Sequence, residues 1–117
     1  MVDILPHVAG LLSGLGAQIE QSFTDTYVTF PLIVLSTPSN VATTCSGHEV
    51  FTRITVQIDA YTPDKKSTME LAQSIDEIMT PAGFTRSIAQ SLPESFAERY
   101  MMQYTCGVDY THNRIIL

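Results

Sequence analysis

The chain has 117 residues, of which 44% are hydrophobic and only 15% are charged, so we expect a single domain over residues 1–117 with one core. The apolar share excludes a disordered protein, and the longest apolar run, Phe30 to Leu35, is far shorter than the roughly 20 residues of a membrane-spanning helix. Twelve acidic residues against six basic ones argue against a DNA- or RNA-binding protein, because such proteins place Lys and Arg on phosphates.

The first predicted element is a short helix from Ile4 to about Leu15. Asp3 can cap this helix, and Pro6 falls in its first turn, where proline is tolerated. Gly16 suits the end of the helix, because glycine readily adopts the left-handed conformation found there. The stretch from Gln18 to Phe30 has no clear pattern.

Two strands are predicted next. Residues 32–37 are rich in β-forming side chains, and the segment from Thr37 to Asn40, which contains Pro38, is expected to break or bend that strand. After a loop through Ser46 and Gly47, residues 51–61 alternate between apolar and polar side chains, which is typical of a strand with one buried face.

A helix and two further strands complete the prediction. Ser67 and Glu70 have the spacing of a capping box, and Pro81 and Gly83 end the helix that follows. The third strand is predicted from the shared parity of Phe84, Ile88 and Leu92. The fourth is predicted from about residue 96 to residue 110, with one face made of Tyr100, Met102, Tyr104, Cys106 and Val108.

The predicted order is therefore α-β-β-α-β-β. Two apolar helical stripes complement one apolar sheet face, so the predicted fold is α+β, a two-layer sandwich of a mostly antiparallel four-stranded sheet with the helices packed on one face. The residues expected to form a shared core are Ile54, Val56, Ile58, Ile75, Met102 and Tyr104.

The sequence contains cysteines and histidines that could bind a metal ion, but their spacing along an extended strand argues against a shared site. Cys45 and His48 have ligand-like spacing, and Cys106 and His112 could complete a set of four. In an extended strand, however, Cys106 and His112 would lie roughly 20 Å apart. We therefore expect two reduced thiols, no metal and no organic cofactor.

The sequence also lacks a catalytic constellation. No G-x-S-x-G motif accompanies His7, His48 or His112, and the glycines from Gly10 to Gly16 lack the Lys-Ser/Thr pair of a phosphate loop. We therefore predict an interaction protein and no enzyme.

Two further groups of residues have simpler interpretations. Asp76 and Glu77 are neighbours on a helix and point in different directions, so they are interpreted as a solvated face. Tyr100, Tyr104 and Tyr110 share strand parity without basic companions, which favours core packing or a subunit interface over stacking on nucleic acid.

Several local strings occur in an order that is typical of one family. They are the strand Arg53-Ile54-Thr55-Val56-Gln57-Ile58-Asp59-Ala60-Tyr61, the helix from Ser67 to Met79, the turn Gly83-Phe84-Thr85-Arg86, and a closing strand with Arg99-Tyr100 and Met102. In these strings, over about residues 30–110, the chain resembles the tail-completion proteins of long-tailed bacteriophages, the tail terminator or tail-to-head joining family. It departs from that family at Ser91-Leu92-Pro93-Glu94, where an acidic-aromatic ending is common.

The resemblance implies a structural role in the virion. Such proteins form a ring, usually a homohexamer, on the head-proximal end of the tail tube, where the ring stops polymerisation of the tube protein and joins the tail to the head-tail connector proteins. The implied location is the tail of a virion assembled in the host cytoplasm, with no membrane. DNA would pass through the lumen without specific binding, and a net charge of −6 would repel its phosphates.

We expect the contacts of such a ring at a loop and at the chain end. An open sheet has edges with unpaired backbone groups, and a low charge density suits a subunit with neighbours. The candidate interface residues are Thr43, Thr44, Cys45, Ser46, Gly47, His48 and Glu49 in the loop, and Ile115, Ile116 and Leu117 at the apolar C-terminus. The alternative is a disordered loop and a tail packed on its own core.

Two other functions are compatible with the sequence. A head-completion or neck protein would dock on the portal side, and a monomeric small-ligand-binding α+β domain would not assemble at all. The mass in solution separates the assembly proteins from the monomeric domain.

Overall fold

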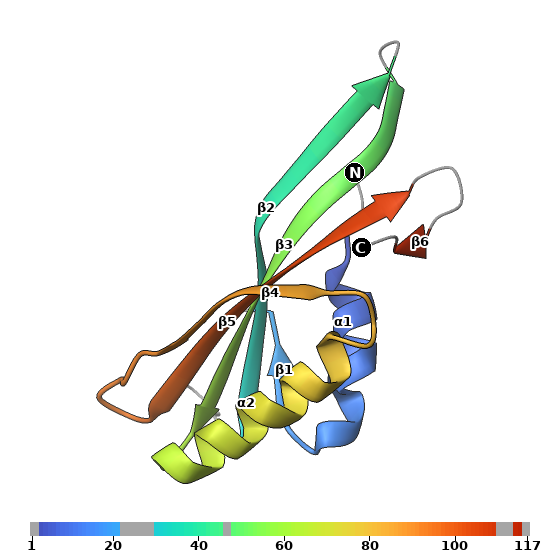
Figure 1. Cartoon of the computed structure of the whole chain (residues 1–117). Coiled ribbons are helices and arrows are strands. Elements are labelled where there is room, and N and C mark those ends of the chain that lie inside the picture. Colours follow the sequence, from blue (N-terminus) through green and yellow to red (C-terminus); the bar gives the residue numbers. More distant parts are fainter. Residues whose placement is uncertain (1–2, 22–29, 46–47, 110–113, 116–117) are drawn as a thin grey trace.

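A mixed β-sheet with two helices packed on one of its faces makes up the fold (Figure 1). The computed structural model describes residues 3–21, 30–45, 48–109 and 114–115. In chain order the elements are α1 (Leu5–Leu12), the 3₁₀ helix η1 (Ser13–Leu15), β1 (Gln18–Glu20), β2 (Leu32–Cys45), β3 (His48–Thr62), α2 (Lys65–Met79), β4 (Thr85–Ser91), β5 (Glu98–Asp109) and β6 (Arg114–Ile115). The predicted α+β class is thus confirmed.

The sheet has more strands than the sequence predicted. Its order is β1-β2-β3-β5-β4, and β6 pairs with the end of β5. The prediction of four strands missed β1, which runs parallel to β2 with Gln18 opposite Leu32, and it missed β6, which pairs with Val108 and Asp109. Strands of two or three residues are too short to show an alternating pattern, so only the tertiary structure reveals them.

Strands β2 and β3 form an unusually long hairpin of 14 and 15 residues. The register shifts between Ser36 and Ser39, so the segment with Pro38 bends the strand, as predicted, without ending it. Proline is tolerated at an edge position, where its missing N–H costs no ladder hydrogen bond. The predicted loop before residue 51 is much shorter than expected, because β2 continues to Cys45 and β3 begins at His48.

The main core lies between the helices and one face of the sheet. All six residues of the predicted core belong to it and are at most 1% exposed, which confirms that prediction. Helix α1 adds Leu5, Val8 and Leu12, and α2 adds Ala72 and Ile75. A second, smaller cluster of Leu32, Val34, Tyr61 and Ala97 lies on the helix-free face.

Helix α2 begins earlier than predicted but ends at Met79 as predicted, and α1 is shorter than predicted. Helix α2 begins at Lys65, and its N-cap is Asp64, whose carboxylate accepts hydrogen bonds from the Ser67 N–H at 2.8 Å and the Ser67 hydroxyl at 3.0 Å. The predicted cap at Ser67 is therefore wrong, because the turn after β3 places Asp64, which caps as well as serine does, three positions earlier. These hydrogen bonds lower the pKa of Asp64. Helix α1 is shorter than predicted and passes through η1 to Gly16, which has a left-handed φ of 73° as expected.

Strand β4 exists where the third strand was predicted, but its side chains do not form a buried face. All seven of its residues are exposed, and Ile88 is 43% exposed. The register shifts between Arg86 and Ile88, so the shared parity inferred from sequence does not hold across that bulge. Phe84, which lies just before the strand, is buried in the core. No helix within the described part of the chain is long and apolar enough to cross a membrane.

Candidate functional site

The most distinctive feature is an arm formed by β2 and β3, which we define as residues 39–45 and 48–55. Strand β1 pairs with β2 only from Leu32 to Val34, and β5 pairs with β3 no further toward the hairpin end than Phe51. Within the described residues, the two outermost pairs of the arm therefore have no third strand beside them. These pairs are Thr44 with Glu49 and Cys45 with His48. Figure 1 shows β2 and β3 continuing together past α2 and β4.

Most of the predicted interface residues lie on this arm. The backbones of Thr43, Thr44 and Cys45 belong to β2, and those of His48 and Glu49 belong to β3, so these residues form a strand hairpin and the expectation of a long loop is corrected. Ser46 and Gly47 lie outside the described residues.

The structure also corrects the expectation of a free apolar end at the C-terminus. Ile115 belongs to β6 and is opposite Val108 of β5, so at this residue the chain continues the sheet and is not a free end. Ile116 and Leu117 lie outside the described residues.

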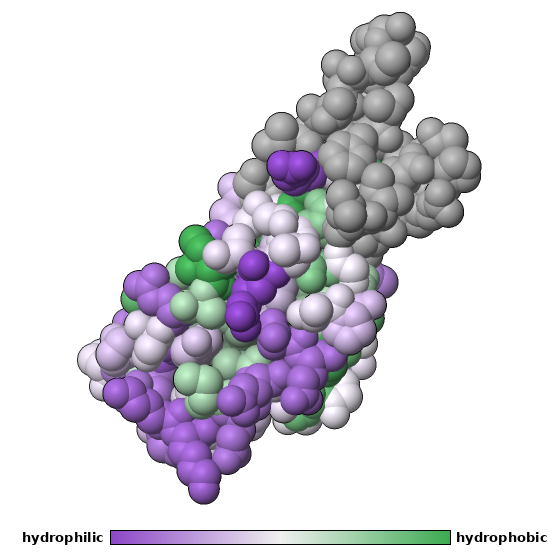
Figure 2. Space-filling view, viewed as in Figure 1, coloured by the Kyte–Doolittle hydropathy of each residue, from purple (hydrophilic) through white to green (hydrophobic). Residues whose placement is uncertain are grey.

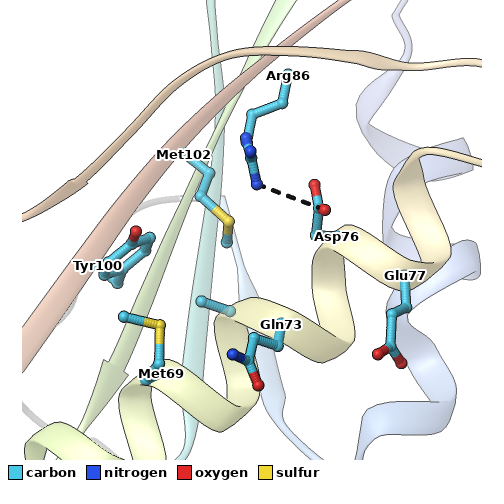
Figure 3. A pocket seen from close by; sticks show the side chains of 8 residues that line it. Met69, Gln73, Asp76, Glu77, Arg86, Tyr100 and Met102 are labelled. Carbon is cyan, nitrogen blue, oxygen red and sulfur yellow. Dashed lines mark ion pairs between the residues drawn. The ribbon is translucent and has the colours of Figure 1, made fainter.

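A groove that the sequence did not predict runs between α2 and β4. It has a volume of about 420 Å³, and its floor is formed by Tyr100 and Met102 of β5. Met69, which is 44% exposed, and Gln73 line it from α2 (Figure 3). A smaller recess of about 110 Å³ shares Met69 and Tyr100 and continues toward Lys65. Figure 2 shows pale green, weakly apolar side chains among purple hydrophilic ones on this side of the molecule.

A polar cluster closes one end of the groove. The Tyr104 hydroxyl donates a hydrogen bond to Asp76 Oδ1 at 2.8 Å, and the Arg86 guanidinium lies 3.4 Å from Asp76 Oδ2. Figure 3 shows Arg86 and Asp76 pointing toward each other from β4 and α2. Burial and the neighbouring carboxylate raise the pKa of Tyr104, so its phenol stays protonated at neutral pH and does not act as a base.

This cluster corrects one interpretation and confirms another. Asp76 is half-buried and bonded, so only the exposed Glu77 fits the interpretation of a solvated face. Tyr104 packs in the core as expected, Tyr100 is half-buried, and Tyr110 lies outside the described residues. The sequence contained one signal of the cluster, because the polar residues Arg86 and Gln90 share the strand parity of the apolar Phe84, Ile88 and Leu92.

The helix-free face of the sheet carries a ladder of hydrogen bonds. Gln103 donates to Gln57 at 3.1 Å, and Gln57 donates to Asp59 at 2.9 Å. The Arg99 guanidinium donates to Asp59 at 2.9 Å and to Glu94 at 3.1 Å. These side chains satisfy one another, and the one cation in the ladder is paired, so the ladder is a structural feature of the sheet with little capacity to bind phosphate.

Among the side chains that the structure describes, those suited to metal or nucleophilic chemistry are not assembled into a site. Cys106 is buried, and burial raises the pKa of its thiol to about 11, so it is not a thiolate at neutral pH. His7 is exposed and stacks near Phe84, while His112 lies outside the described residues. Among the residues that the structure describes, no group of three or more His, Cys, Asp or Glu side chains could hold a metal ion.

Comparisons with known proteins do not assign a family to the chain. No family model matches the sequence, and no curated protein matches it significantly. Function is therefore inferred from the arm, the sheet edges and the groove, together with the resemblance noted in the sequence.

Proposed function

We propose that this chain is a structural subunit of a long-tailed bacteriophage, a tail terminator that forms a ring of six copies on the head-proximal end of the tail tube. The ring stops polymerisation of the tube protein and joins the tail to the head-tail connector proteins. The resemblance of residues 30–110 to tail-completion proteins supports this function. The structural observation that carries it is the β2–β3 arm.

The arm has the properties of a segment that contacts another subunit. Its strands of 14 and 15 residues compare with an average of about 5–6 residues in globular proteins. Beyond Phe51 its outermost pairs have no third strand within the described residues, and an isolated two-stranded ribbon is at best marginally stable in water. From Ser39 to Phe51 the only Asp, Glu, Lys or Arg is Glu49, so the arm lacks the lysines that commonly protect exposed strand edges. Contact with a neighbouring copy would stabilise it.

The other described features fit a structural subunit better than an enzyme. Tyr104 and Cys106 stay protonated at neutral pH, and the groove holds a salt bridge between Asp76 and Arg86 where a catalytic base would be needed. Arg86 and Arg99 are both engaged by carboxylates. An acidic ring with few free cations would let DNA pass through its lumen without binding it.

The first test is the mass of the purified chain in solution, followed by negative-stain microscopy of the chain mixed with tail tubes. We expect a ring that caps one end of each tube. Thr43→Lys adds a charge to the arm and should reduce ring formation, because an edge lysine opposes strand contact. Thr80→Lys adds the same charge at the exposed end of α2 and serves as the control. A 12.9 kDa monomer at high concentration would contradict the proposal and favour a ligand-binding domain.

Complementation of a phage that lacks the protein distinguishes the position in the virion. Loss of a terminator should give tails of abnormal length, or tails that fail to join filled heads. Loss of a neck protein should instead give tails of normal length and heads that leak DNA. Infectious particles with normal tails in the absence of the protein would show that the proposal is wrong.

A further inference from the structure

Among the residues that the structure describes, the sheet has two edges without a strand partner, one on each side, and they lie at different positions along the strand direction. Strand β4 forms one edge, and all of its residues are exposed. On the other side, β1 covers β2 only from Leu32 to Val34, so within the described residues the outer edge of the arm segment Asn40–Cys45 has no strand partner. Each edge presents backbone N–H and C=O groups that another strand can pair with.

We propose that neighbouring copies of this chain associate by strand addition, with the Asn40–Cys45 edge of one copy pairing with β4 of the next. This inference rests on the proposed ring and names the contact that would close it. The Asn40–Cys45 edge lacks the charges and prolines that commonly oppose strand pairing, whereas β4 carries one charge and a bulge at Ser87, which the pairing must accommodate. The segment Asn40–Cys45 contains no charged residue or proline, and the one charged residue of β4, Arg86, is turned inward to Asp76.

The direction of the pairing follows from the sheet topology. Strands β2 and β3, β3 and β5, and β5 and β4 are each antiparallel, so β4 runs opposite to β2 within one copy. Copies related by rotation in a ring that is joined through aligned strands keep the same strand direction. Strand β4 of one copy therefore meets β2 of the next in antiparallel orientation.

The two faces of the sheet restrict the register. Residues that are directly opposite each other share a face, and a slip of one residue exchanges the faces. Asn40 and Ala42 are in register with Ile54 and Thr52, which are both buried in the structure. On β4, Ala89 and Ser91 are in register with Met102 and Tyr100, which are on the same helix-covered side.

One antiparallel register satisfies this condition over the full length of both segments. It places Asn40 opposite Ser91, Val41 opposite Gln90, Ala42 opposite Ala89, Thr43 opposite Ile88, Thr44 opposite Arg86 and Cys45 opposite Thr85. Ser87 stays unpaired, as it does in the pairing of β4 with β5. The register would cover the exposed Ile88 with a β-branched side chain, which is a favourable cross-strand pair.

This contact also predicts the geometry of the ring. Within one copy, the residues in register with Thr85 across the sheet are Thr105, Thr55 and Ser39. In the proposed contact, Thr85 pairs instead with Cys45 of the next copy. Successive copies are therefore displaced by about six residues, or roughly 20 Å, along the strand direction. A closed sheet accommodates such a stagger by tilting its strands relative to the ring axis.

Disulfide cross-linking tests the register, because the native Cys45 is one of the predicted partners. Thr85→Cys places a second thiol opposite it at an exposed position, while the buried Cys106 stays protected. Under mild oxidation we expect Thr85→Cys to give a ladder of covalent oligomers larger than dimers, since each copy carries one thiol for each neighbour. Gln90→Cys lies on the same face of β4 at its other end, and it should not cross-link, because only a parallel arrangement would place it near Cys45.

The controls distinguish the failure of this contact from the failure of the ring. Adding Cys45→Ser to the Thr85→Cys variant should abolish the ladder, and a cross-link that persists would mean that two copies of β4 meet, which overturns the proposal. Dimers alone, or a ladder from Gln90→Cys in place of Thr85→Cys, would overturn it too. A ring seen by mass that gives no Thr85→Cys ladder refutes this contact and leaves the proposed function standing. A chain that stays monomeric would refute both the strand contact and the proposed ring.

Discussion

The hydrogen bond between Tyr104 and Asp76 gives a quantitative test of how the groove is held together. Tyr104→Phe removes one oxygen atom from a fully buried ring and leaves the packing unchanged. The lost bond is 2.8 Å long and has a charged acceptor, a kind of bond that contributes about 1.5–3 kcal/mol to stability. The Asp76 side chain is 34% exposed and keeps Arg86, so water can replace part of the lost bond. We therefore expect a loss of about 1.5 kcal/mol, at the lower end of that range.

Urea unfolding followed by circular dichroism measures this loss. With an m-value of about 1.5 kcal/mol/M, which is usual for a domain of this size, the midpoint should fall by about 1 M. Tyr100→Phe is the matched control on the same strand, because Tyr100 is half-buried, and its midpoint should change by less than about 0.3 M. A Tyr104→Phe midpoint equal to that of the unsubstituted chain would refute the assigned role of this bond.

The difference between the two proteins should also depend on pH. The folded state raises the pKa of Tyr104 above its ordinary value of 10.0, so the stabilisation is complete below pH 10 and is lost as the pH rises further and the unfolded chain releases its proton. The phenylalanine variant has no such proton. The stability difference should therefore shrink above pH 10, and a difference that grows there would contradict the assignment. The raised pKa of Cys106 acts equally in both proteins and cancels.

Three further predictions concern the core, the first helix and the buried thiol. Val56→Ala removes two methyl groups from the centre of β3, where the side chain is 0% exposed, and should cost about 1–3 kcal/mol in urea unfolding; an unchanged midpoint would contradict its place in the core. Gly16→Ala should destabilise the chain by about 1 kcal/mol because its φ is 73°, whereas Gly10→Ala, in an open helical position, should stabilise it by about 0.5–1 kcal/mol. In a Cys45→Ser background, Cys106 should react with a thiol reagent at pH 8 only at the rate of unfolding, and labelling as fast as that of a free thiol would show that it is accessible.

The elements with a strong hydrophobic period were predictable from the amino-acid sequence alone. Strand β3 alternates apolar and polar residues over its body, and α2 repeats apolar residues at helical spacing, so both their existence and their buried faces could be predicted. The shared core of β3, α2 and β5 followed from these faces. The bend at Pro38 and the left-handed Gly16 were also predictable, because the backbone chemistry of proline and glycine is local.

The edges of the sheet and the candidate interfaces depend on how the elements pack together, which no local pattern encodes. The three residues of β1 have no period of their own and form a strand only because β2 offers a partner. The length of the arm depends on where β1 and β5 stop pairing, which is a property of the assembled sheet. Strand β4 is exposed on both faces because α2 covers its neighbours and a bulge interrupts its parity. The polar cluster at the end of the groove also depends on packing, because its side chains come from three separate elements. These side chains are Asp76 of α2, Arg86 of β4 and Tyr104 of β5. Local periodicity reports which side of an element is apolar, whereas an edge or a groove is defined by what the neighbouring elements leave uncovered.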